Sequence, residues 1–281
     1  MGEGSRIQVT VDGRGVATVT MDRPEVRNAF DGPLTAELGE AAGVLGGDPA
    51  VRVVVLTGVG EVFSAGADLG WMGSMRDHTF EEHLADSARV NAMLRALYDL
   101  PVPLVGRVNG HALGGGVGLV AVCDVGIAAE DARFGFPEVT LGLAPAVISP
   151  YVVRKVGHSF ARAVFVTGEQ FDADRALAAG LVHQVVASAD LDRAVGAAVD
   201  RCLRAGPQAV AVAKRLADLA LRPLDEATAA TPALIAALRV SDEGQEGMQA
   251  FLGRRPPAWL PSARERVRSP RGDPGNAPGP P

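Results

Sequence analysis

The chain has 281 residues, of which 47% are hydrophobic and 21% are charged, so it has the composition of a globular protein that can bury a large core. Its formal net charge of −6 argues against a nucleic-acid-binding or membrane-surface protein, because both need a basic face. The two cysteines and five histidines show no metal-ligand spacing, so no metal site is expected. With no secretory pattern at the N-terminus and no apolar stretch of about 18 residues, we expect a cytoplasmic protein.

The first half of the chain alternates between strand and helix patterns. Strands are indicated by alternating or continuous β-branched residues, and helices by apolar residues three or four positions apart. This alternation predicts an α/β core with parallel strands, in which a strand–strand–helix unit recurs. In chain order we expect a hairpin at 7–21, a helix from 32 to 47, a strand at 51–57, a helix from Phe80 to Pro101, a strand at 102–108, a helix at 115–122 and a strand at 125–129.

Helical patterns dominate the second half. The length favours one core domain with a smaller unit appended, which we place at residues 1–200 and 201–261. Residues 262–281 are rich in Pro, Gly and Arg and are expected to form a disordered tail. The expected elements are helices at 159–166, 173–179, 191–204 and 207–222, a strand at 181–186 and a helical stretch at 224–252.

Three consecutive glycines, Gly114 to Gly116, stand between an apolar strand and a helix. Each glycine costs roughly 1 kcal/mol relative to alanine in a helix, so the run must serve a close approach to the backbone. One interpretation is a ligand that rests on bare N–H groups at a helix N-terminus. The other is tight packing of the helix on the sheet, and the glycines alone do not decide between them.

Two further loops carry small or reactive residues. The segment Ala65 to Ala67 follows a buried strand and can offer backbone N–H groups with no side chain in the way, although a tight connection would look the same. Ligands of α/β sheets collect at the carboxyl ends of the strands, so this loop and the triple glycine are expected to face one crevice. A third loop, Phe134 to Val139, contains Glu138.

Four motifs occur in order along the chain: Arg23-Pro24 with Asn28-Ala29, Ser64 to Leu69, Asn109 to Asp124, and Phe134 to Glu138. Together they resemble the crotonase, or enoyl-CoA hydratase/isomerase, superfamily over about residues 7–260. The stretch Leu141 to Tyr151 further resembles the bacterial methylglutaconyl-CoA and isohexenylglutaconyl-CoA hydratase branch of that superfamily.

The resemblance implies a core that is a spiral of ββα repeats, a helical C-terminal trimerisation region, and a homotrimer or dimer of trimers. It also implies an acyl-CoA substrate from fatty-acid or branched-chain acyl metabolism and no separate cofactor. By motif position, the N–H groups of Ala67 and Gly115 would form an oxyanion hole for the thioester oxygen. Residues implied to bind the acyl-CoA are Ala65, Gly66, Ala67, Asp68, Leu69, Gly114 and Gly115.

Glu138 falls on the position of the family's second catalytic glutamate. Burial in an apolar cleft would raise the pKa of such a carboxyl, which suits a proton shuttle at the α-carbon of the thioester. The family's first catalytic glutamate falls on Gly118, and the expected helix around it contains no acid. Two-carboxylate hydration is therefore in doubt, whereas one-base chemistry needs only Glu138 and the oxyanion hole.

Three residues have more than one interpretation. Gly118 removes side-chain volume, which would leave room for a branched acyl group or a water molecule, or would only reflect packing. Asp68 is expected to cap or orient its own loop rather than transfer a proton. Tyr151 could line the acyl pocket, although Ser149-Pro150 fits an ordinary helix start.

The sequence therefore leaves three functions open. The first is a hydratase-type lyase that acts on an α,β-unsaturated acyl-CoA. The second is a Δ3-Δ2 enoyl-CoA isomerase or another enolate-forming enzyme, which Gly118 favours. The third is a crotonase-like subunit that binds CoA esters without catalysis.

Overall fold

Two β-sheets form the centre of the structure, a computed structural model that describes residues 4–260. In the six-stranded sheet all neighbours are parallel except β1 and β2, which form the expected hairpin. The α/β fold class is confirmed. The strand order is β1 (Ile7–Val11), β2 (Val16–Met21), β3 (Val53–Gly58), β5 (Leu104–Val108), β7 (Val125–Ala129) and β10 (Gln184–Val186).

The second sheet consists of four strands of three residues each, in the order β4-β6-β8-β9. Each of three successive repeats gives one strand to each sheet and then continues into helix: β3 and β4, β5 and β6, β7 and β8. The recurring strand–strand–helix unit is thus confirmed. The short strands are β4 (Val62–Ser64), β6 (His111–Leu113), β8 (Arg133–Gly135) and β9 (Gln170–Asp172).

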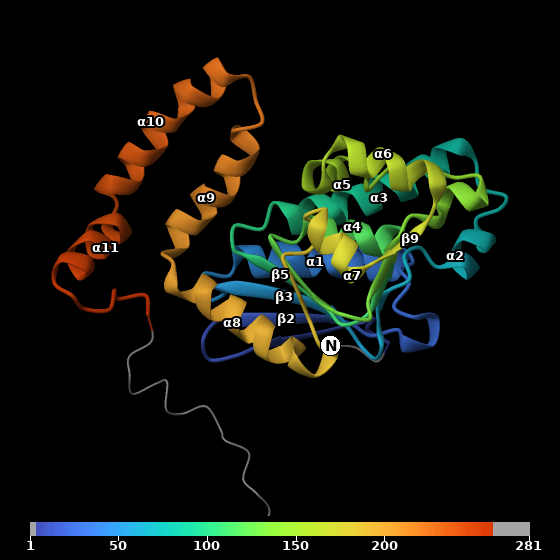
Figure 1. Cartoon of the computed structure of the whole chain (residues 1–281), viewed down its shortest axis with the longest axis horizontal. Helices are drawn as coiled ribbons and strands as arrows, with labels where there is room; N and C mark the ends of the chain where they lie inside the picture. The colour runs from blue at the N-terminus through green and yellow to red at the C-terminus, as the bar shows by residue number, and fades with distance from the viewer. Residues whose placement is uncertain (1–3, 261–281) are drawn as a thin grey trace, which may run out of the picture.

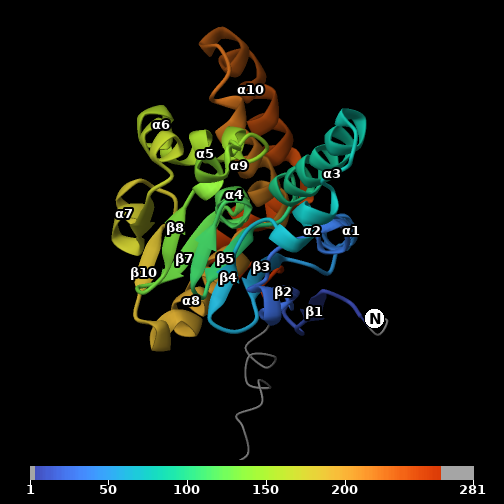
Figure 2. The same ribbon diagram turned by 90° about the vertical axis from the view of Figure 1, so that its right-hand side faces the viewer.

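Helices cover both faces of the large sheet (Figure 2). The strand β3 shows why, because all six of its residues are buried and successive side chains enter different cores. Val54 and Leu56 belong to the main core with α1, α3 and α4, whereas Val53 and Val55 contact the cluster beneath α8. The helices of this core are α1 (Gly32–Gly47), α2 (Leu69–Ser74), α3 (Phe80–Tyr98), α4 (Gly115–Val122), α5 (Ser149–Val156), α6 (His158–Thr167), α7 (Ala173–Ala178) and α8 (Leu191–Arg204), with short 3₁₀ turns at Pro24–Val26, Pro137–Leu141 and Ser188–Asp190.

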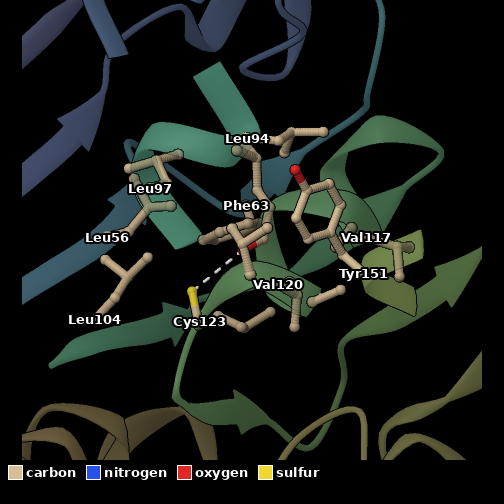
Figure 3. Packing of buried hydrophobic residues seen from close by; sticks show 14 of the residues in the cluster. Leu56, Phe63, Leu94, Leu97, Leu104, Val117, Val120, Cys123 and Tyr151 are labelled. Atoms are coloured by element: carbon tan, nitrogen blue, oxygen red, sulfur yellow. Dashed lines mark hydrogen bonds between the residues drawn. The ribbon is translucent and has the colours of Figure 1, made fainter. Parts of the chain in front are cut away.

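Helix α4 lies inside the main core, with every residue from Gly116 to Val122 buried. Apolar side chains from β3, α3 and α5 surround it, and the Cys123 thiol at its end donates a hydrogen bond to the carbonyl of Leu119 (Figure 3). A helix held on all sides gives a fixed position to its own N-terminus, where the triple glycine lies.

Three C-terminal helices project away from this core (Figure 1). They are α9 (Pro207–Leu219), α10 (Leu224–Val240) and α11 (Asp242–Leu252). The expected helical stretch 224–252 is broken at Ser241, whose hydroxyl caps α11 by accepting from the amide of Gly244.

The domain boundary expected between residues 200 and 201 stays a prediction, and it falls inside helix α8. The expected tail at 262–281 lies outside the described residues. Within residues 4–260 no helix is both long enough and apolar enough to cross a membrane.

Candidate active site

The loop after β4 leaves one backbone amide without a partner. Residues 65–68 run beside residues 27–30, where Phe30 and Ala67 form a parallel bridge. Three of the four amides at 65–68 donate hydrogen bonds within the protein, but the amide of Ala67 has no acceptor among residues 4–260. The three bonds join the amide of Ala65 to the carbonyl of Arg27 at 3.0 Å, that of Gly66 to the hydroxyl of Ser64 at 3.2 Å, and that of Asp68 to the carbonyl of Phe30 at 3.0 Å.

A second set of free amides begins α4. Gly114 has φ +51° and ψ −122°, a backbone conformation that glycine adopts readily and other residues rarely adopt. Its amide donates a hydrogen bond to the carbonyl of Gly135 at 2.9 Å. The next two amides, of Gly115 and Gly116, precede the first intrahelical bond and have no acceptor in the described chain. They also lie at the positive end of the helix dipole.

The two loops meet because β4 and β6, the strands that lead into them, are parallel neighbours. A Cβ atom built on Gly66 would lie 2.5 Å from the carbonyl oxygen of Leu113 and 3.1 Å from the nitrogen of Gly115. The chain around residues 66 and 67 is therefore in contact with the start of α4. Free N–H groups on adjoining loops can together stabilise an oxygen on which negative charge develops.

Packing accounts for two of the three consecutive glycines. A Cβ on Gly115 would lie 2.0 Å from Cζ of Phe30, and one on Gly116 would lie 2.4 Å from the carbonyl oxygen of Ser64. Tight packing of the helix on a sheet is thus confirmed at Gly116, because Ser64 belongs to β4. Gly115 instead packs against Phe30, which lies outside the named strands, and Gly114 is required by its backbone conformation. Phe30 received no role from the sequence, where it was one more apolar residue.

Glu138 lies at the same place, in the 3₁₀ turn that follows β8. Its Oε1 is 3.0 Å from the position that a Cβ on Gly114 would take. Its Oε2 is buried and has no hydrogen-bond partner among the described residues. Burial raises the pKa of the Glu138 carboxyl above its ordinary value, so this group is suited to gain and lose a proton nearer neutral pH.

The raised pKa gives a stability prediction with a definite sign. The folded protein holds the Glu138 proton more tightly than the unfolded chain, so the contribution of Glu138 to the free energy of unfolding falls as pH rises above the unfolded pKa of about 4.3. Glu138→Gln removes this titration. We expect the variant to gain stability relative to wild type as pH increases from 4 to 8, measured by urea denaturation at each pH. A difference that is constant with pH, or that shrinks, would contradict the raised pKa.

The space expected beside Gly118 is filled. A Cβ on Gly118 would lie 2.3 Å from Cγ2 of Ile148 and 3.0 Å from its Cβ, with Leu94 next nearest. Ile148 is buried in the main core, immediately before α5. The expectation of room for a branched acyl group or a water molecule is therefore wrong for this structure, because the glycine accommodates a branched side chain of the protein itself.

A double-mutant cycle measures that contact. Gly118→Ala should destabilise the fold by about 1–3 kcal/mol, the usual cost of overpacking a core. In an Ile148→Ala background the same substitution should cost much less, because the clashing methyl group is gone. Chemical denaturation of the four proteins provides the test, and equal costs in the two backgrounds would show that Ile148 does not fill the space.

Asp68 caps α2, as expected. Its Oδ1 accepts from the amides of Gly70 at 2.8 Å and Trp71 at 3.2 Å. Burial acts to raise the pKa of Asp68, but the hydrogen bonds from Trp71, Arg23 and Gly70 outweigh it and lower the pKa. Asp68 thus remains an anion held in place, which is a poor state for proton transfer.

Two further residues singled out from the sequence, Leu69 and Tyr151, lie in different surroundings. Leu69 begins α2 and its side chain is exposed. Tyr151 is buried in the apolar cluster beside α4 (Figure 3). Its ring centroid lies 5.3 Å from that of Tyr98. Burial raises the pKa of its hydroxyl. A role for Tyr151 in the acyl pocket stays a prediction.

Two cavities lie away from this site. One, of about 460 Å³, is bounded by Thr18 and Thr57 of the large sheet and by Asp192 of α8. The other, of about 390 Å³, lies between α8 and α9, near Cys202 and Lys214. Neither contains free amides beside a buried carboxyl, so we locate the candidate site by its chemistry rather than by the size of a hollow.

Comparisons with known proteins give one consistent result. The profile of the family described as enoyl-CoA hydratase/isomerase matches residues 12–261. The chain is 36% identical over 250 residues to 2,3-dehydroadipyl-CoA hydratase of Escherichia coli (86% of this chain, 94% of that one) and 32% identical over 243 residues to crotonyl-CoA hydratase of Syntrophomonas wolfei (85% and 92%). A crystal structure of an enoyl-CoA hydratase from Shewanella pealeana matches the fold with a TM-score of 0.86 and 38% identity, covering 90% of this chain and 96% of the other.

Proposed function

The chain belongs to the enoyl-CoA hydratase/isomerase family, and from this premise we propose that it adds or removes water across the double bond of an α,β-unsaturated acyl-CoA thioester. One observation carries the proposal. The unbonded amides of Ala67 and Gly115 lie on adjoining loops, and the buried carboxyl of Glu138 lies beside Gly114 at the start of α4.

In the proposed reaction the thioester oxygen accepts hydrogen bonds from the amides of Ala67 and Gly115. Water attacks the β-carbon, and the electrons of the double bond move onto that oxygen as an enolate. Glu138 takes a proton from the attacking water and then delivers that proton to the α-carbon, while the electrons of the enolate return from the oxygen to re-form the thioester carbonyl, which completes the addition. Each oxyanion donor in such a site typically contributes about 3–4 kcal/mol to transition-state stabilisation.

A second candidate, Δ3-Δ2 enoyl-CoA isomerase or a related enolate-forming activity, is favoured by Gly118 and Ile148. Hydration with two carboxylates needs an acid beside Glu138, whereas α4 contributes Gly118 and the space next to it holds an aliphatic side chain. Moving a double bond only requires that one base removes a proton and returns it. Both candidates use the same enolate and the same two amides.

For the substrate we propose an acyl-CoA with no separate cofactor. Exposed leucines near the site, Leu69, Leu141 and Leu143, offer apolar surface to an acyl chain. The resemblance of the segment 141–151 to the methylglutaconyl-CoA and isohexenylglutaconyl-CoA hydratase branch makes a branched glutaconyl-type acyl group part of the proposal.

We also propose that the chain assembles as a homotrimer or a dimer of trimers. The projecting helices α10 and α11 leave large apolar side chains exposed, among them Leu224 at 76%, Val240 at 79% and Phe251 at 83%. A monomer rarely exposes so much apolar surface on one region. Sedimentation equilibrium should give three or six times the 29.0 kDa chain mass, and a monomer at micromolar concentration would contradict the assembly.

The activity itself is tested with three substrates. Crotonyl-CoA, methylglutaconyl-CoA and a 3-enoyl-CoA are incubated with the protein, and the absorbance of the conjugated thioester is followed. Hydration lowers the absorbance of the first two and incorporates oxygen from ¹⁸O-labelled water into product. Gain of absorbance from the 3-enoyl-CoA without ¹⁸O incorporation would eliminate the hydratase and support the isomerase.

A further inference from the structure

The side chain of Arg23 contacts the loop that carries Ala67 through the carboxylate of Asp68, although no part of the proposed reaction uses it. Arg23 follows β2 and is only 8% exposed. Its Nη1 donates to the carbonyl of Ala29 at 2.5 Å, and its Nη2 contacts the carboxylates of Asp68 at 3.0 Å and Asp31 at 3.2 Å. A buried guanidinium with two carboxylate partners is costly to desolvate, so its position calls for an explanation.

Both carboxylates are helix caps. Asp31 accepts from the amide of Leu34 at the start of α1, while Asp68 accepts from two amides at the start of α2. Arg23 therefore links the N-termini of two helices that are far apart in the sequence. Asp31 has a second cation, Arg6, at 2.9 Å, but Arg23 is the only basic side chain paired with Asp68 among the described residues.

Ala67 lies directly between the tethered groups. On one side the carbonyl of Gly66 accepts from the amide of Phe30 at 2.8 Å; on the other the amide of Asp68 donates to the carbonyl of Phe30 at 3.0 Å, and the Asp68 carboxylate contacts Arg23. The peptide that carries the free amide is thus fixed through both neighbours. A misplacement of about 1 Å in a catalytic group can cost about 100-fold in rate, so such a tether has catalytic value.

We propose that Arg23 is a positioning residue that holds the amide of Ala67 in the direction needed to bind an enolate oxygen. The proposal rests on the proposed function, because it assigns that amide to a thioester. It distinguishes Arg23 from a residue that only stabilises the fold. Loss of its tether should weaken binding of an enolate more than binding of an uncharged ester.

The experiment compares two probes with the full-length protein. Acetyl-CoA reports binding of an uncharged thioester, and acetoacetyl-CoA reports the enolate, which is followed by its ultraviolet absorbance in the bound state. Arg23→Met removes the tether, and Arg23→Lys restores one donor. Arg6→Met is the matched control, because it removes an arginine partner of Asp31 without touching Asp68.

We expect Arg23→Met to reduce the enolate-to-ketone ratio of bound acetoacetyl-CoA by about tenfold or more, while the Kd for acetyl-CoA changes less than threefold. Arg23→Lys should recover part of the ratio, and Arg6→Met should resemble wild type. If Arg23→Met does not fold, Asp68→Asn, which keeps the capping oxygen but loses the charge, should show the same selective loss. Equal losses of binding for both probes, or an unchanged enolate-to-ketone ratio, would overturn the role of Arg23 but leave the proposed function intact. A wild-type protein that binds neither probe would overturn the proposed function with it.

Discussion

Glu138→Gln is expected to reduce kcat for the best acyl-CoA substrate by about 10² to 10⁴-fold, the usual contribution of a positioned acid or base. Glutamine keeps the size of the side chain, but it cannot exchange a proton with the α-carbon. The amides of Ala67 and Gly115 are untouched, so KM should change little. Steady-state kinetics together with acyl-CoA binding to the variant measures the two effects separately.

Glu130→Gln is the matched control, because Glu130 is an exposed glutamate that follows β7. It should retain the wild-type rate. If Glu138→Gln also retains the rate, Glu138 is not the proton carrier. If the wild-type protein binds CoA esters but turns over none of the acyl-CoA esters in a test panel, the chain is a binding subunit without catalysis.

Gly66→Ala is expected to have the second large effect, a loss of kcat of about 100-fold or more. The new methyl group would lie 2.5 Å from the carbonyl of Leu113 and 3.1 Å from the nitrogen of Gly115. It must therefore push the loop of Ala67 away from the start of α4. Overpacking should also cost about 1–3 kcal/mol of stability, measured by chemical denaturation.

Gly60→Ala separates the steric effect from backbone strain. Gly60 has φ +77°, close to the +86° of Gly66, but a Cβ there has no atom within 4 Å. The control should lose some stability and keep its kcat. Equal rates for Gly66→Ala and Gly60→Ala would show that contact between the two loops does not matter for the reaction.

The sequence predicted best those elements whose apolar or amphipathic run ends at a clear boundary. The helix Gly115–Val122 and the strand Val125–Ala129 have the expected bounds, and α8 matches residues 191–204. Each combines a continuous apolar or amphipathic run with a clear stop, such as Gly206 after α8. Propensity and packing agree at these places.

The second sheet could not be predicted in the same way. Its strands have three residues each, which is too short to show a period of two, and their partners are 20 to 50 residues away. Strand β4, for example, contributes only Val62 to Ser64. Yet this sheet brings the Ala67 loop against α4. The sequence therefore predicted that the two loops face one crevice, but not that a second sheet joins them.

Contacts between distant residues explain the remaining differences in the site. Ile148, which fills the space at Gly118, is 30 positions away in the sequence, and Arg23 and Asp68 are 45 positions apart. No local sequence pattern predicts either of these two contacts. Glu138, in contrast, was predicted from its motif, and its burial accounts for its raised pKa.

A crystal structure of Glu138→Gln with crotonyl-CoA tests most directly whether the two amides bind the thioester. The substitution is expected to keep the substrate unreacted. We expect the thioester oxygen at about 2.7–3.1 Å from the nitrogens of both Ala67 and Gly115, with the side chain at position 138 next to the α-carbon. A thioester oxygen bound elsewhere, or an α-carbon out of reach of residue 138, would contradict the proposed site.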